Sequence, residues 1–296
     1  MTREILSEML SYRMDTYGSE YDEYVSKYFE DMYVGDASSF YRIVGSHPKH
    51  LFVCRYVGTV KYAGKNDVYQ VDNRIYLDTK NFRNSANNFN FIASTYVLLE
   101  LIRMKVPGIY LFLSQEYEKG NYVNGTEYFP YENDSDQLGY KIKNCDVTLY
   151  LGNYGNQDLL YTSAGHRAAS DEFVSVISKH FSVTPKLEYV VHALASTSVV
   201  LSDFSGIVPE NVVLPCGVDH FNGAKNITDE NAHEFFADYG YIIELIEKLK
   251  QLTTIDLPIN RVPNFDEFLG FDLDEDKNSQ QKPNPESKGF WSRLKR

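Results

Sequence analysis

The segment around residue 166 combines an imidazole, a guanidinium and a carboxylate. It holds His166, Arg167 and Asp171, between a predicted strand and a predicted helix. Such a turn brings ligands to a helix N-terminus, where histidine and arginine would suit an anion or a phosphoryl group. Asp171 is also an ordinary residue for the first turn of a helix. We therefore favour a plain helix start and keep the three residues as catalytic candidates.

A second segment places a thiol beside an acid and an imidazole. Cys216, Asp219 and His220 follow a short apolar strand. A nucleophilic cysteine needs a base that is near in space, oriented by a third group and usually distant in sequence. Cysteine is also among the most frequently buried residue types. We favour a core thiol at Cys216, with a cysteine nucleophile as the alternative.

Two further patterns bear on metals and cofactors. His47 and His50 lie three residues apart, but Pro48 makes the segment a turn, and no cysteine or carboxylate completes a familiar set of ligands. Gly152 and Gly155 lack the third glycine of a dinucleotide fingerprint and the Lys-Ser/Thr of a P-loop. This glycine pair predicts a turn between paired strands. We expect neither a metal ion nor a cofactor.

The elements that would hold these residues follow from the apolar pattern. Residues 40 to 80 contain short β-branched or aromatic runs separated by turn residues, which predict a small antiparallel sheet. Strands and helices then alternate, which predicts a mixed sheet with packed helices and an α+β fold class. The later elements are expected as a helix over 88–105, strands over 109–113, 147–151, 159–162 and 212–214, and helices over 168–181, 187–202 and 228–252.

Three regions are expected along the chain. Residues 1–34 are an acidic, tyrosine-rich helical segment, residues 35–252 a mixed α/β globular core, and residues 253–296 a flexible tail. A sub-boundary near 114–144 is left open, because that stretch is polar and rich in turn residues. The tail is expected to be disordered, since residues 277–289 have no apolar side chain except proline.

The tail carries the clearest signal for binding. Acidic and aromatic side chains alternate over residues 264–276, and the only tryptophan lies beside the basic C-terminal end. Aromatic side chains can dock in a groove while the charges steer association with a basic partner. A solubilising tail without a partner explains the pattern equally well. The candidate partner-binding residues are Phe265, Phe268, Phe271, Asp272, Asp274 and Trp291.

The net charge argues against several classes of function. The chain has 29 basic and 41 acidic side chains and a formal charge of −12. It therefore repels phosphate backbones and anionic lipid, which argues against a broad nucleic-acid or membrane footprint. No apolar run reaches the length of a membrane span, and the N-terminal residues lack a secretory pattern. Three widely spaced cysteines fit reduced thiols. We expect a cytoplasmic protein, in a host cytoplasm if it is viral.

These features favour a non-enzymatic acidic protein that binds another protein. It would be an assembly subunit, with a homo-oligomer as one form, or an inhibitor of a host or competitor enzyme that processes nucleic acid. The Tyr/Asn/Lys-rich composition suits a virus or a mobile element. The alternative is an α/β enzyme for a phosphorylated or nucleotide-like substrate, centred on the segment around His166. Because no catalytic motif is present, we favour the non-enzymatic interpretation.

Overall fold

The computed structural model describes the following parts of the chain. These are residues 2–12, 24–25, 27–28, 33–34, 40–55, 67–78, 89–113, 115–118, 121–124, 141–153, 155–163, 166–186, 204, 206–220 and 235–263.

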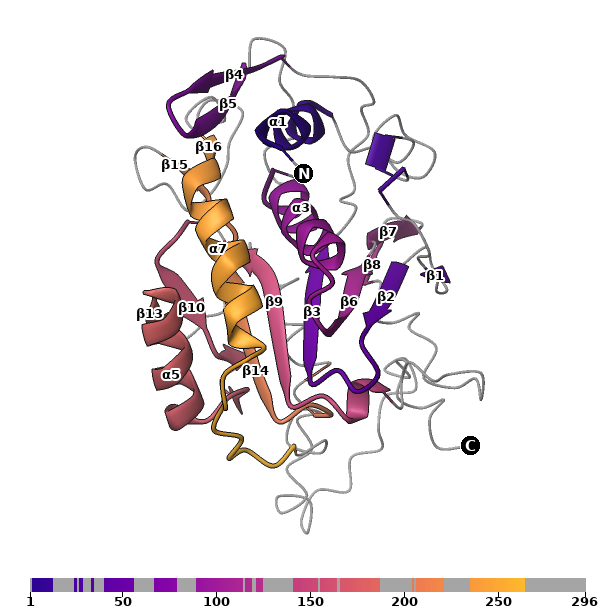
Figure 1. Cartoon of the computed structure of the whole chain (residues 1–296), viewed down its shortest axis with the longest axis vertical. Helices are drawn as coiled ribbons and strands as arrows, with labels where there is room; N and C mark the ends of the chain where they lie inside the picture. The colour runs from indigo at the N-terminus through magenta and orange to yellow at the C-terminus, as the bar shows by residue number, and fades with distance from the viewer. Residues whose placement is uncertain are drawn as a thin grey trace, which may run out of the picture.

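A mixed sheet of eight strands forms the centre of this described part (Figure 1). Its four central strands, β6, β3, β9 and β14, run parallel to one another, and β2 and β10 flank them antiparallel. All six residues of β6 are buried, as expected for a parallel strand covered on both faces. In spatial order the strands are β1 (Tyr33–Val34), β2 (Phe40–Val44), β6 (Gly108–Leu113), β3 (His50–Arg55), β9 (Val147–Asn153), β14 (Glu210–Pro215), β10 (Asp158–Leu160) and β13 (Thr184–Lys186).

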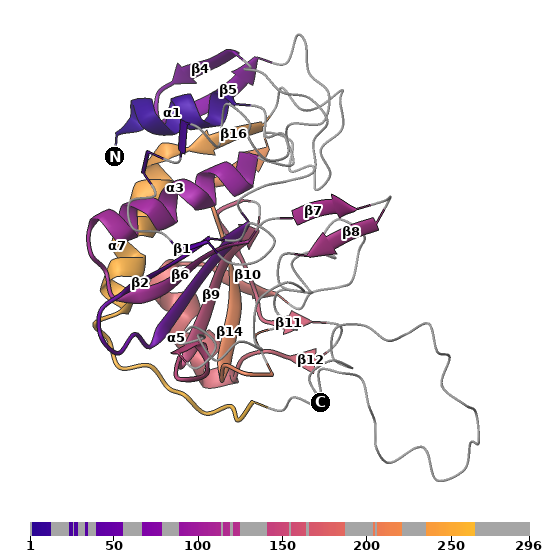
Figure 2. The same cartoon turned by 90° about the vertical axis from the view of Figure 1, so that its right-hand side faces the viewer.

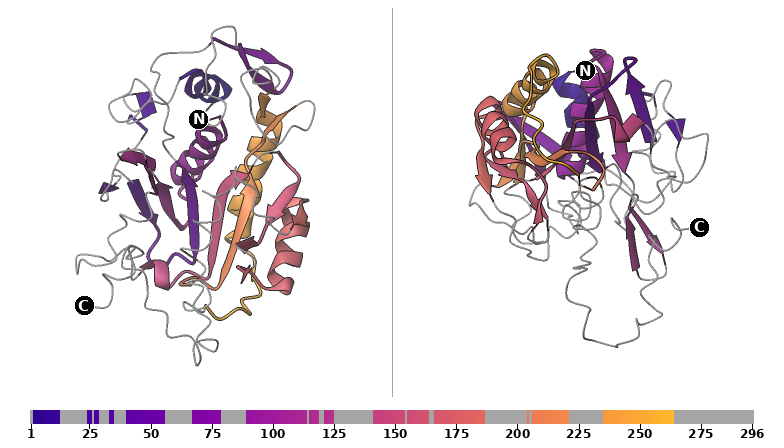
Figure 3. Two further views of the ribbon diagram at one scale, coloured as in Figure 1. Left: turned by 180° about the vertical axis from the view of Figure 1, so that it is seen from behind. Right: turned by 90° about the horizontal axis from the view of Figure 1, so that it is seen from below.

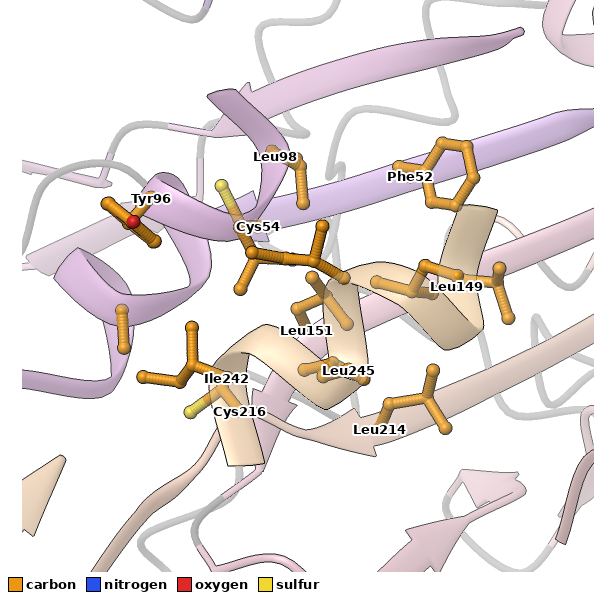
Figure 4. Close-up of a cluster of buried hydrophobic side chains, with 14 of the residues drawn as sticks. Phe52, Cys54, Tyr96, Leu98, Leu149, Leu151, Leu214, Cys216, Ile242 and Leu245 are labelled. Atoms are coloured by element: carbon orange, nitrogen blue, oxygen red, sulfur yellow. The ribbon is translucent and has the colours of Figure 1, made fainter. Parts of the chain in front are cut away.

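Helices cover one face of this sheet. Figure 2 shows α3 (Phe89–Arg103) and α7 (Tyr239–Leu252) packed side by side on it. Twelve residues of α3 are buried, because the helix lies between the sheet and α1 (Arg3–Ser11). The close-up in Figure 4 shows the core between the sheet and these helices. It contains Phe52, Cys54, Tyr96, Leu98, Leu149, Leu151, Leu214, Cys216, Ile242 and Leu245.

The remaining strands lie at the ends and on the second face of the main sheet (Figures 2 and 3), whereas the third large helix, α5 (Asp171–Phe181), shares the buried cluster of α3 and α7. A small antiparallel sheet joins β15 (Val218–His220), β16 (Phe235–Asp238), β5 (Arg74–Asp78) and β4 (Asp67–Val71). Two hairpins are β7 (Gln115–Glu118) with β8 (Asn121–Asn124), and β11 (Thr162–Ser163) with β12 (His166–Arg167). Helix α5 packs against α7.

The mixed fold class is confirmed, whereas the allocation of strands differs from the sequence analysis. Residues 40–55 join the main sheet, and only β4 and β5 of the 40–80 region enter the small antiparallel one. Strands β9 and β10 are not neighbours, because β14 lies between them. The glycine pair Gly152 and Gly155 is therefore not a turn between paired strands. Such pairings join residues far apart in sequence and leave no local signal.

Helix α7 begins later than the apolar pattern suggested. It starts at Tyr239, where the Asp238 side chain accepts a hydrogen bond from the Tyr241 main-chain N–H. Residues before it form β16, which pairs with β5 and β15. Tertiary pairing thus overrides the helical spacing. The predicted helix over 187–202 lies outside the described residues.

Residues 253–263 lie along the amino ends of the parallel strands, although the sequence analysis assigned them to a tail. The carboxylate of Glu210 accepts hydrogen bonds from the main-chain N–H groups of Asn260 and Arg261, at 3.1 and 3.0 Å. It also accepts one from Ser170 at 2.6 Å and is fully buried. The first residues of the predicted tail are therefore hydrogen-bonded to the folded core. Across the described ranges, no helix is long and apolar enough to cross a membrane.

Candidate functional site at the carboxyl ends of the parallel strands

The order in which the chain forms the parallel strands indicates which end of the sheet is suited to bind a ligand. After β3 the chain crosses through α3 to β6 on one side of β3, and later enters β9 on the other side. The segment entering β9 packs through Ile142 and Cys145 on the face opposite α3. Strand order therefore reverses between β3 and β9. In open α/β sheets, ligands bind at the carboxyl ends of the strands beside such a reversal.

A buried asparagine lies at this reversal. Asn90, in the first turn of α3, is 3% exposed, and its Nδ2 donates a hydrogen bond of 3.0 Å to the Gly152 carbonyl near the end of β9. Its Oδ1 is buried and has no hydrogen-bond partner in the described part of the chain. A buried acceptor without a donor costs about 1–3 kcal/mol, which a ligand N–H or O–H would recover.

Acidic residues follow two of the parallel strands at the same end. Glu116 lies in β7, directly after β6, and Asp219 lies in β15, directly after β14. An Asp219 carboxylate oxygen is 4.0 Å from the position that a Cβ would take on Gly155, beyond the end of β9. His220 follows Asp219 and is paired through its main chain with Phe235. Carboxylates and imidazoles are the groups that enzymes use to accept a proton from water.

Cys216 lies at this end as well but is packed into the core. Its side chain is fully buried between β14 and α7, as Figure 4 shows. Burial raises the pKa of the Cys216 thiol to about 12. Since the thiolate is the reactive form, this side chain has the properties of a core thiol.

The candidates around residue 166 lie at the opposite end of the sheet. The Ala168 carbonyl accepts a hydrogen bond of 2.9 Å from Asn211 at the start of β14, whereas Cys216 follows the end of that strand. Asn211 and Cys216 are five residue steps apart along the extended chain, which is about 17 Å at roughly 3.3 Å per step. The structure does not bring the two candidate sets together.

Arg167 and Asp171 form an exposed ion pair with 2.7 Å between Nη1 and Oδ1. The hydrogen bond from Arg167 lowers the pKa of the Asp171 carboxyl. Ser170 caps α5 by accepting a hydrogen bond from Phe173. His166 lies in β12, paired with Ser163. These are the contacts of a helix start.

The two histidines of the 45–50 turn are also at the amino ends. His47 is exposed and its Nδ1 lies 3.1 Å from the Ser46 hydroxyl, whereas His50 begins β3 and is buried. Among the described residues, no three His, Cys, Asp or Glu side chains lie close enough together to hold a metal ion. The predicted partner-binding residues Phe265, Phe268, Phe271, Asp272, Asp274 and Trp291 lie outside the described residues.

The sequence analysis missed Asn90 and Glu116. Glu116 had a usable signal, because it comes three residues after the end of the buried strand over 109–113. Residues 114–144 were instead interpreted as a polar, turn-rich stretch with a possible sub-boundary. Asn90 had no signal, since burial of an asparagine follows from the packing of α3 and not from its neighbours in sequence.

Solved structures share the fold described above. An aminopeptidase from the archaeon Desulfurococcus kamchatkensis matches over 88% of this chain and 97% of its own, at a TM-score of 0.52 and 10% identity. Aminopeptidase PepT from Bacillus cereus matches over 84% and 96%, at 0.51 and 9%. A peptidase/endoglucanase matches over 86% and 99%, at 0.50 and 10%. At such low identity the similarity shows the fold.

No protein-family model matches the sequence, and the search of curated proteins also finds no match.

These similarities correct the functional interpretation of the sequence. The chain shares its fold with peptidases over most of its length. The preferred interpretation, a non-enzymatic inhibitor or assembly subunit of viral or mobile-element type, is therefore wrong, and so is the preference against an enzyme. Composition misled here, because net charge describes a surface and not a fold, and because tyrosines taken as interface residues include Tyr96, Tyr110 and Tyr150, which are fully buried in the core.

Proposed function

We propose that this protein is a hydrolase of peptide substrates, with its reaction centre at the carboxyl ends of β6, β3, β9 and β14. The observation that carries the proposal is the fold shared with two aminopeptidases over 84% to 88% of the chain. The strand reversal between β3 and β9 supports the same end of the sheet.

Three residues receive roles in this proposal. Glu116 accepts the proton of the attacking water, because it follows a buried strand at the reaction centre. Asn90 offers its buried Oδ1 to an N–H of the substrate while its Nδ2 stays bound to Gly152. Asp219, partly exposed beside Gly155, binds the positive charge of a substrate amino terminus. The proton taken by Glu116 passes to the leaving amine when the peptide bond breaks.

The direct test is a substrate panel on the purified full chain. We expect release of nitroaniline from aminoacyl-p-nitroanilides and of free amino acids from short peptides, assayed with and without added divalent cations. Acetylated forms of the same substrates should be turned over at least tenfold more slowly, because they lack the charge that Asp219 would bind. Hydrolysis of carboxymethylcellulose with no hydrolysis of peptides would refute the peptide assignment. Inactivity on the whole panel would also count against it.

A further inference from the structure

A cavity of about 290 Å³ lies at the amino ends of the parallel strands, opposite the proposed reaction centre. Its floor comes from the starts of β3 and β9, and its roof from residues 253–259, which follow α7. Figure 1 shows this roof segment passing beneath the sheet. Its size is at the lower limit for small-molecule sites, which are usually about 300–1,000 Å³. The cavity therefore suits a compact metabolite.

The roof is held in place by Glu210. Its carboxylate binds the main-chain N–H groups of Asn260 and Arg261, directly after the roof residues. At the other end of the roof, the Thr253 hydroxyl donates a 2.9 Å hydrogen bond to the Lys250 carbonyl in the last turn of α7. Both ends of the roof are thus tied to the core, and the cavity is preformed.

One wall of the cavity carries an unused polar atom. His50 is 8% exposed, and its Nε2 is buried without a hydrogen-bond partner. Thr148 and Asn211 also have such atoms in the described part of the chain, but neither lines this cavity. Burial lowers the pKa of His50 to about 4, so the ring is neutral and can either donate or accept a hydrogen bond. A ligand with a polar group at this point would satisfy it.

The rest of the lining is charged in part and apolar in part. Lys49 lies 3.3 Å from the Asp146 carboxylate at one side, and Asp256 adds a second acidic group from the roof. The apolar lining comes from Pro107, Val147, Ile255, Leu257 and Ile259. Lys49 and Asp146 are already paired with each other, so a cation that took up Asp146 would leave Lys49 without its partner, and an anion that took up Lys49 would do the same to Asp146 and would also face Asp256. A ligand that carries both charges can exchange with the pair and satisfy both side chains. A zwitterion with an apolar side chain matches all three kinds of surface.

We propose that this cavity binds a free α-amino acid with an aliphatic side chain. The ammonium group lies toward Asp146 and Asp256, the carboxylate toward Lys49, and the side chain against the isoleucine and leucine residues of the roof. His50 Nε2 hydrogen-bonds the polar end of the ligand. The length of the parallel strands separates this site from the proposed reaction centre. The inference does not depend on the proposed function.

Isothermal titration of L-leucine into the full chain tests the inference. We expect a Kd below about 1 mM, as ordinary contact efficiency gives for a ligand of this size. 3-Methylbutylamine, which lacks the carboxylate, 4-methylpentanoate, which lacks the ammonium group, and glycine should each bind at least tenfold more weakly. Equal binding of the amine and of leucine would overturn the zwitterion assignment. Absence of leucine binding at 10-fold the expected Kd would overturn the site.

Variants locate the bound leucine. Lys49→Met and Asp256→Asn should each weaken binding about tenfold, the loss of one charge-assisted hydrogen bond. Lys186→Met is the matched control, because Lys186 forms a similar exposed pair with Asp158, 2.6 Å apart, far from the cavity. Leucine binding that both cavity variants leave unchanged would place the ligand elsewhere and refute the proposal.

A spectroscopic measurement covers the case in which a variant fails to fold. In the wild-type chain, leucine should shift the ring ¹⁵N and ¹H signals of His50. It should leave those of His180 in place, because that ring is already bonded to the Lys248 carbonyl at 2.7 Å. A shift at His180 with none at His50 would contradict the proposed contact.

Discussion

The two ends of the parallel strands use buried polar side chains in different ways. At the amino ends, Glu210 has its carboxylate satisfied by three main-chain N–H groups of this same chain. At the carboxyl ends, Asn90 keeps a buried oxygen without a partner among the described residues. A satisfied buried group stabilises the fold, whereas an unsatisfied one costs stability that a ligand can return. Glu210 therefore has a role in stability, and Asn90 is suited to bind a ligand.

The amino ends do not follow this division throughout, because His50, Thr148 and Asn211 there also keep a buried polar atom without a hydrogen-bond partner among the described residues. Of these, His50 lines a cavity whose roof is held by hydrogen bonds to Glu210. Helix α7 joins the two ends, with its N-cap Asp238 bonded to Gly217 after β14 and its C-cap Thr253 in the cavity wall. One helix therefore contacts both the proposed reaction centre and the proposed amino-acid site.

The largest expected effect is at the carboxyl ends. Glu116→Gln should lower kcat/KM for a peptide substrate about 10²–10⁴-fold, because it removes the base that accepts the proton of water. Urea denaturation of the same variant measures the free energy of unfolding, so that a loss of reactivity is distinguished from a loss of folding. Glu118→Gln is the matched control, since Glu118 lies on the same strand but pairs with Asn121 at the far end of the hairpin. Equal losses in both variants would remove Glu116 from the reaction.

Glu210→Gln should affect stability more than activity, which is the reverse of the effect expected for Glu116→Gln. It should lower the free energy of unfolding by about 3 kcal/mol, because an amide N–H then faces a main-chain N–H that had bonded a carboxylate oxygen. Urea denaturation measures the loss. Glu244→Gln removes the charge of Glu244 from its pair with Lys248, and because the Glu244 side chain is 59% exposed the cost should be less than about 1 kcal/mol. If Glu210→Gln were equally mild, the amino ends would have no special role in stability.

His50 should make stability depend on pH. Its pKa is about 4 in the folded chain and 6.5 ordinarily, because burial disfavours the charged ring. The unfolded chain therefore takes up a proton first, and the stability present above pH 6.5 is lost as pH falls toward 4. Between pH 6.5 and 5 the loss should be about 2 kcal/mol, at 1.36 kcal/mol per pKa unit.

The measurement is a series of urea curves for the wild type and for His50→Phe, which cannot titrate. In His50→Phe, the free energy of unfolding should not show this loss between pH 6.5 and 5. His47→Gln, which changes an exposed ring three residues earlier, should keep the wild-type slope. Parallel slopes for the wild type and His50→Phe would show that His50 is not buried in its neutral form.

The smallest effects are expected for the two exposed lysine pairs. Lys49→Met and Lys186→Met should each change the free energy of unfolding by less than about 1 kcal/mol, since both lysines are more than half exposed. Thermal unfolding of both variants checks this. A loss of several kcal/mol in Lys49→Met alone would mean that the pair holds the cavity wall together, and its effect on leucine binding would then be structural.

Much of the fold was predictable because its elements have local patterns. The helix predicted over 88–105 is α3, and the strand over 109–113 is β6, since long apolar runs have few other solutions. The start of α7 was missed, because Phe235–Asp238 pair with a strand about 160 residues earlier. The candidate site was predicted only in part. Asp219 and His220 follow β14 at the carboxyl end, whereas the segment around His166 is a helix start at the other end.

The sequence by itself determined the mixed fold class, the buried strands and the reduced thiols, because periodicity and composition act over a few neighbouring residues. Only the tertiary structure decided that β14 lies between β9 and β10, that Asn90 meets Gly152, and that Glu210 fastens residues 260 and 261. Those contacts join residues 50 to 62 positions apart. Their stability comes from burial and hydrogen bonding that exist only once the sheet has formed.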